Sequence, residues 1–240
     1  MKMKNYFLYI VMVFVGLFVS CKKEEAEKPK VTYETTSKAK PEVVSDANQI
    51  EVADLPINME GTNFLIHPIG VMSGNGKGMK SSYDSEKSFT VSNYGEYQIT
   101  GYLKNLKFQE IGKDTIYALT DKQILIETAT YLKTFADNKS KQQLLVYSLA
   151  DMDTNKDGKL DSSDIKSLYI STISGQKFTK LSTDFQELID WKIIESKNLL
   201  YFRTIEDTNK NGEFDAKDSL QYQFVNLLDK EWKVISYKPI

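Results

Sequence analysis

Residues 153–164 read Asp153-Thr-Asn-Lys-Asp-Gly-Lys-Leu-Asp-Ser-Ser-Asp164, and residues 207–218 read Asp207-Thr-Asn-Lys-Asn-Gly-Glu-Phe-Asp-Ala-Lys-Asp218. Each stretch places oxygen-bearing side chains at positions 1, 3, 5, 9 and 12 and a glycine at position 6. Ca²⁺ takes about six to eight oxygen ligands, and a short loop can supply them from alternate side chains, one backbone carbonyl and a sharp turn at glycine. The spacing therefore predicts two calcium-binding loops.

The two loops belong to a longer internal repeat. Residues 145–182 align with residues 199–236 at a constant offset of 54 without a gap. Repeats of this size are typical of structures whose units bury their faces against one another. We therefore expect residues 144–240 to contain one structural unit twice, and the apolar positions that correspond are Leu145 and Leu199, Tyr147 and Tyr201, Ile170 and Phe224, Phe178 and Trp232, and Leu181 and Ile235.

The segments that flank the loops have the composition of β-strands. Residues 199–205 are rich in aromatic and β-branched residues, and Leu220, Tyr222 and Phe224 alternate with glutamines, as in a half-buried strand. These segments predict an antiparallel four-stranded meander. The other expected strands are 144–149, 167–171, 190–194 and 232–236, with turns at 195–198 and 226–231.

The end of the first copy resembles the closing hairpin of a TolB-type β-propeller blade. The stretch that carries the resemblance is Leu168-Tyr-Ile-Ser-Thr-Ile-Ser-Gly-Gln-Lys-Phe-Thr-Lys-Leu-Ser182, whereas residues 226–231 replace the glycine turn in the second copy. The resemblance covers roughly 100 residues, two blades at most, and full closure needs about four or more. It implies a mainly β fold of antiparallel four-stranded meander repeats, forming a partial or small propeller-like structure or an open stack.

Residues 59–143 are expected to form a β-rich N-terminal part. The period of apolar residues predicts short strands at 97–102, 107–111, 115–119 and 123–128. Residues 124–136 also place apolar side chains near helical spacing, so a helix stays open for that segment.

The two loops resemble EF-hand and dockerin-type calcium loops. The resemblance implies that Lys159 and Glu213 bind through their backbone carbonyls and that Leu160 and Phe214 pack inward. An aspartate at position 12 implies weak sites, with Kd of roughly 10⁻⁵ to 10⁻³ M, suited to permanent occupancy by two Ca²⁺ ions. The implied ligands are Asp153, Asn155, Asp157, Lys159, Asp161 and Asp164 in the first loop and Asp207, Asn209, Asn211, Glu213, Asp215 and Asp218 in the second.

A metal-free turn is the alternative interpretation of each loop, because Asp, Asn and Gly favour turns without any metal. The acidic side chains favour a cation, since carboxylates crowded into twelve residues repel one another unless a positive charge offsets them. Magnesium is a poorer candidate, because its octahedral shell retains water.

The N-terminus predicts a lipoprotein of the bacterial cell envelope. Lys2 and Lys4 precede an apolar run over residues 6–19 that is short for a membrane span. The run ends in Leu17-Phe-Val-Ser-Cys21, which resembles the lipobox of bacterial lipoproteins and implies acylation of Cys21. We expect a signal peptide at 1–20, a flexible tether over 21–58 and attachment to the outer membrane on either face.

Composition excludes several other classes of function. The net charge of −2 and the single arginine, Arg203, argue against nucleic acid as a partner. The only histidine, His67, is expected to be structural, and Trp191 and Trp232 are expected in the core.

The expected function is that of a non-catalytic, calcium-stabilised module that binds a protein or glycan of the envelope or the cell exterior. One alternative is a carboxylate-dependent hydrolase or glycan-processing protein, for which Glu187 and Asp190 are candidate acids. Another is an EF-hand calcium sensor, which requires helices around the loops.

Overall fold

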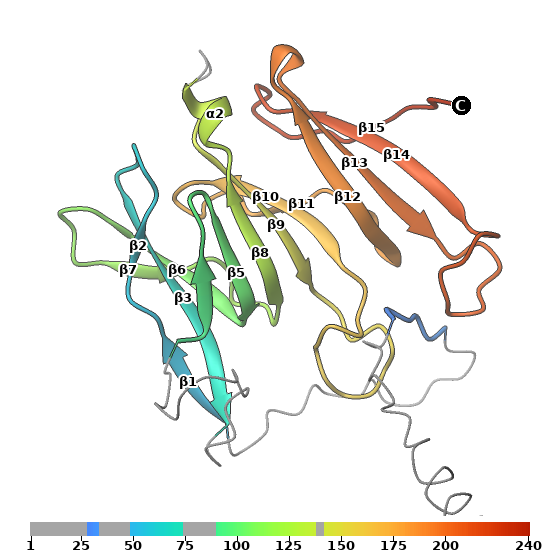
Figure 1. The fold of residues 1–240 in the computed structure, drawn as a ribbon, viewed down its shortest axis with the longest axis horizontal. Coiled ribbons are helices and arrows are strands. Elements are labelled where there is room, and N and C mark those ends of the chain that lie inside the picture. Colours follow the sequence, from blue (N-terminus) through green and yellow to red (C-terminus); the bar gives the residue numbers. More distant parts are fainter. Residues whose placement is uncertain (1–27, 34–48, 74–89, 138–141) are drawn as a thin grey trace, which may run out of the picture.

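The computed structural model describes residues 28–33, 49–73, 90–137 and 142–240, and these residues form three antiparallel sheets (Figure 1). The six-stranded middle sheet lies between a five-stranded first sheet and a four-stranded last sheet. The mainly β fold with antiparallel sheets is thus confirmed. Within the described residues the sheets are layers, and they do not close into a ring of blades.

The first sheet is built around the long strand β3 (Phe64–Ser73). On one side β3 pairs with β1 (Gln49–Ala53) and β2 (Ile57–Asn58), and on the other with β6 (Asn105–Glu110), which also pairs with β7 (Ile116–Ala118). The tether expected over residues 21–58 is therefore wrong for residues 49–58. Residues 49–53 and 57–58 form β1 and β2 at an exposed edge of the first sheet, where a strand needs few apolar side chains.

The middle sheet contains the first copy of the predicted meander. Its order is β11 (Thr179–Lys180), β10 (Ser167–Thr172), β9 (Leu144–Ala150), β8 (Leu125–Tyr131), β5 (Gln98–Leu103) and β4 (Ser92–Tyr94). Residues 124–136 are thus mainly a strand, followed by the short helix α2 (Lys133–Phe135).

Strand β9 is buried at every residue, because sheets cover both of its faces. Leu145, Tyr147 and Leu149 belong to the first core, between the first and middle sheets, whereas Leu144 and Val146 belong to the second core, between the middle and last sheets. A strand buried on both faces has a continuous apolar sequence instead of an alternating one.

The last sheet is the second copy, a meander in the order β12 (Gln186–Ile194), β13 (Leu199–Glu206), β14 (Ser219–Asn226) and β15 (Ile235–Ser236). The turn expected at 195–198 is a 3₁₀ turn, η2 (Glu195–Lys197), closed by Asn198 in the left-handed conformation at φ 56°. The order of this sheet is that of the predicted four-stranded meander, but the strand expected at 232–236 is confined to Ile235–Ser236.

One face of β14 differs from the expectation. The alternation of Tyr222 and Phe224 with glutamines predicts that the aromatic residues face the core, but Val225 and Leu227 enter the second core instead. Tyr222 and Phe224 lie on the outer face, where Tyr237 contacts both rings at centroid distances of 5.9 Å. A one-residue change of strand register exchanges the core face and the outer face of a strand. On the outer face of β14, the contacts among Tyr222, Phe224 and Tyr237 stabilise the observed register.

Candidate metal centre

Both predicted metal loops connect neighbouring antiparallel strands. Residues 153–164 (the first loop) join β9 to β10, and residues 207–218 (the second loop) join β13 to β14. The two loops lie at the same end of their sheets, with the blue segment 28–33 running beside them (Figure 1). The flanks are strands, so the helices that a calcium sensor of the EF-hand type requires are absent from the described residues around the loops.

In the first loop, the side chains of the predicted ligands accept hydrogen bonds from the loop backbone. Asp153 Oδ2 accepts the N–H of Gly158 at 2.9 Å. Asp164 closes the loop, because Oδ1 accepts the N–H of Thr154 at 2.7 Å and Oδ2 accepts the N–H of Asp161 at 3.0 Å. Each side chain at position 3, 5 or 9 accepts the N–H two residues later, and these pairs are Asn155 with Asp157, Asp157 with Lys159, and Asp161 with Ser163.

The second loop repeats these hydrogen bonds at equivalent positions. Asp207 Oδ2 accepts the N–H of Gly212 at 2.7 Å, and Asp218 accepts the N–H groups of Thr208 at 3.1 Å and Asp215 at 2.8 Å. The intermediate pairs are also present, namely Asn209 with Asn211, Asn211 with Glu213, and Asp215 with Lys217. The two loops therefore share one conformation as well as one sequence pattern.

The backbone turns at the same two positions in each loop. Position 4 is a left-handed lysine, with φ 61° at Lys156 and 57° at Lys210. Position 6 is glycine at φ 84° in both loops, Gly158 and Gly212, and this conformation is strained for any residue with a Cβ. The glycine that the sequence pattern requires is thus placed where the chain needs it.

One carboxylate oxygen of the first loop has no partner. Asp153 Oδ1 is buried and accepts no hydrogen bond from any residue that the structure describes, although its companion oxygen is bonded to Gly158. Burial also raises the pKa of the Asp164 carboxyl, while the N–H groups of Asp161, Thr154 and Asn155 lower it. A buried anionic oxygen without a partner is strongly unfavourable, and a hard cation would supply the missing contact.

The loops therefore fit a calcium ion in donor chemistry, with carboxylate, amide and carbonyl oxygens as the donors. Among the described residues, however, no three acidic, histidine or cysteine side chains converge as a ready-made metal cluster. In both loops the predicted ligands accept hydrogen bonds from the loop backbone. These hydrogen bonds hold each carboxylate against the backbone and do not bring the carboxylates together.

The acids considered for catalysis have separate partners. Asp190 is ion-paired with Arg203, whose guanidinium hydrogen bond holds the pKa of that carboxyl below its usual range. Glu187 is buried and accepts the backbone N–H of Lys166. His67 lies on β3 and its Nε2 is 3.3 Å from Gln109 Oε1, which is a structural contact.

We expect Glu187 to make the stability of the fold depend on pH. Burial raises its pKa from 4.5 to about 7, against the opposing effects of the Lys166 N–H and ammonium group. Between these values the folded state keeps the proton and the unfolded state releases it, so the free energy of unfolding falls by about 1.4 kcal/mol per pH unit, or about 3 kcal/mol in total. This loss of stability begins above pH 4.5 and is complete above pH 7.

We therefore expect Glu187→Gln to remove this pH dependence. Denaturant unfolding of the wild type and the variant at pH 5 and pH 8 measures the difference, which isolates Glu187 from every other titrating group. Identical changes with pH in the two chains would show that Glu187 is not the responsible group.

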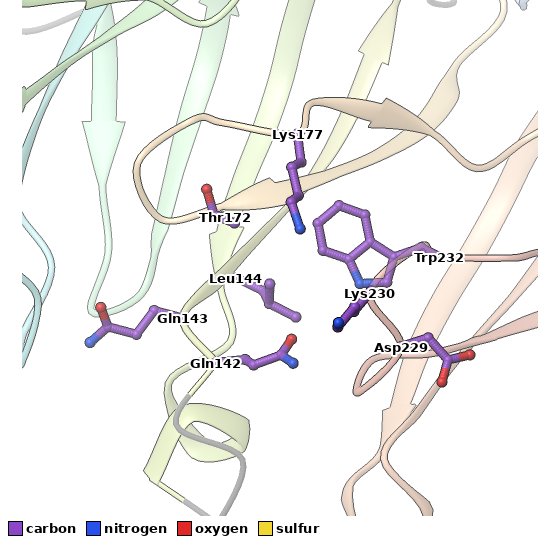
Figure 2. A pocket seen from close by; sticks show the side chains of 8 residues that line it. All are labelled: Gln142, Gln143, Leu144, Thr172, Lys177, Asp229, Lys230 and Trp232. Atoms are coloured by element: carbon purple, nitrogen blue, oxygen red, sulfur yellow. The ribbon is translucent and has the colours of Figure 1, made fainter.

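A cavity of about 200 Å³ lies between the middle and last sheets (Figure 2). Trp232 belongs to the second core and also lines this cavity, and its buried indole N–H has no hydrogen-bond partner among the described residues. Lys177 and Lys230 line the cavity with it, and Asp229 is the one carboxylate among its lining residues. The cavity therefore does not provide the pair of acids that a glycosidase uses.

Trp191 packs against the second core.

The N-terminal predictions lie mostly outside the described residues. Residues 1–27, including the expected signal peptide and Cys21, are not described. Among the described residues, no helix is both long and apolar enough to cross a membrane. Residues 28–33, which we call the strap, are hydrogen-bonded to both loops. This contact could not be predicted from the sequence, because the strap has the polar composition of a tether.

Comparison with protein families, with curated proteins and with solved structures found no match to the chain.

Proposed function

We propose that the chain is a calcium-stabilised, non-catalytic lipoprotein of the bacterial cell envelope. The observation that carries the metal site is the buried, unpartnered Oδ1 of Asp153 in a loop whose conformation is repeated in the second copy. Each loop binds one Ca²⁺ and fixes the connection between two strands, so that calcium has a structural role. The two meanders are copies of one blade-like unit.

The lipid on Cys21 and the envelope location rest on the lipobox-like sequence. The module presents a surface to a protein or glycan outside the cytoplasm. The outer face of the last sheet is suited to such a partner, because Tyr201, Tyr222, Phe224 and Tyr237 gather there at ring distances of 5.4–5.9 Å. Aromatic residues supply much of the binding energy at protein surfaces.

Calorimetric titration of the full chain with CaCl₂ tests the metal proposal. We expect two sites with Kd in the range of roughly 10⁻⁵ to 10⁻³ M and weaker binding of Mg²⁺ in a parallel titration. No heat of binding with calcium at several millimolar would refute the proposal. Equal binding of magnesium would refute the assignment of the metal.

A further inference from the structure

The strap is hydrogen-bonded to the first loop through two alternate residues, Lys30 and Thr32. The N–H of Lys30 donates to the carbonyl of Ser163 at 3.2 Å, and the N–H of Thr32 donates to the carbonyl of Thr154 at 2.8 Å. Side chains add two bonds, because the Thr154 hydroxyl donates to the Lys30 carbonyl at 2.9 Å and the Thr32 hydroxyl donates to the Asn155 carbonyl at 3.0 Å. The strap therefore contacts both ends of the first loop, at residues 154–155 and at Ser163.

The residue between these contacts binds the second loop. The N–H of Val31 donates to the carbonyl of Gly212 at 3.0 Å, and the Val31 side chain is only 3% exposed. Tyr33 lies close to Asp207, the first predicted ligand of that loop, because burial and then the Asp207 carboxylate raise the pKa of the Tyr33 hydroxyl to about 12. One short segment thus joins two loops that belong to different sheets.

Gly212 provides space for the strap as well as a turn. A Cβ at Gly212 would lie 2.4 Å from the Val31 carbonyl oxygen, whereas a Cβ at Gly158 would meet nothing within 4 Å. Both glycines have φ 84°, so a side chain would strain both loops equally. The effects of a side chain at Gly158 and at Gly212 therefore differ only through the contact of Gly212 with the strap.

We infer that the strap is a positioning element that joins the two loops into one cation-binding unit, so that calcium binding and strap docking stabilise each other. The inference rests on the proposed calcium binding. The strap's partners Thr154, Ser163 and Gly212 lie between predicted ligands, so a cation that fixes the ligands also fixes the strap's anchors. Coupling of two binding events is reciprocal, and the strap therefore raises the affinity of both loops for calcium.

Trypsin cleavage after Lys30 reports strap docking in the full chain. We expect calcium to slow hydrolysis of the Lys30–Val31 bond about tenfold, because cleavage requires the docked backbone to open. Val31→Gly deletes the buried side chain without adding charge and should weaken calcium binding at both loops about tenfold. Lys28→Ala changes an exposed side chain of the same segment and should behave as the wild type.

A comparison of substitutions at Gly212 and Gly158 distinguishes release of the strap from a general loss of folding. In calcium, Gly212→Ala should release the strap and speed cleavage at Lys30 about tenfold relative to Gly158→Ala. Equal cleavage in these two variants, or wild-type calcium affinity in Val31→Gly, would overturn the inference while calcium binding stands. A wild-type chain that binds no calcium would overturn the proposed function as well.

Discussion

Replacing Asp153 and Asp207 together by asparagine is expected to abolish the stabilisation of the fold by calcium. Asparagine keeps an oxygen that can accept the N–H of Gly158 or Gly212, but it removes the negative charge. At about 100 times Kd, each filled loop adds about 2.7 kcal/mol to the free energy of unfolding, so the variant loses about 5 kcal/mol. Calcium should raise the melting temperature of the wild type by roughly 10–20 °C and leave that of the variant unchanged.

The matched control for this experiment is Asp121→Asn, the same change at an exposed position outside both loops. It should melt as the wild type does, with and without calcium. An undiminished calcium shift in the double variant would show that these two carboxylates do not bind the stabilising ion.

Truncation of Tyr147 is expected to have the second large effect. Tyr147 is fully buried on β9 in the first core, and its hydroxyl is 2.7 Å from Ser171 Oγ. Tyr147→Ala creates a cavity the size of an aromatic ring, so we expect the free energy of unfolding to fall by about 4 kcal/mol. Tyr147→Phe keeps the ring and loses one hydrogen bond, which predicts a loss of about 1 kcal/mol.

Denaturant unfolding without calcium measures both Tyr147 variants free of any metal effect. A loss below about 1 kcal/mol for Tyr147→Ala would contradict the packing of β9 between two sheets, since a strand covered on both faces cannot relax into such a cavity.

The local features of the fold could be predicted from the sequence. The strands β13 and β14 and the turn at 195–198 follow from composition and short-range turn chemistry, which require no knowledge of distant partners. The loops could be located for the same reason, because the pattern from Asp153 to Asp164 contains its own turn at Gly158.

Features that depend on tertiary contacts could not be predicted in this way. The face of β14 that enters the core depends on a one-residue choice of register, and Tyr222 and Phe224 are apolar enough for either side. Strand β1 lies at a sheet edge with four of its five residues exposed, so its sequence has the composition of a linker.

The docking of the strap could not be predicted either, because its sequence contains no local signal of it. Val31 is its one fully buried residue, and its other contacts are mainly backbone hydrogen bonds, which leave no trace in a sequence. Its partners lie more than a hundred positions away along the chain.

The docked strap also limits how far the module can stand from a membrane. With a lipid on Cys21, as proposed, the chain from Cys21 to Lys28 spans at most about 25 Å. After release of the strap, the attachment point of the module becomes Gln49, the first residue of β1, and the chain from Cys21 to Gln49 spans at most about 100 Å. Calcium at the two loops would then limit the height of the module above the bilayer.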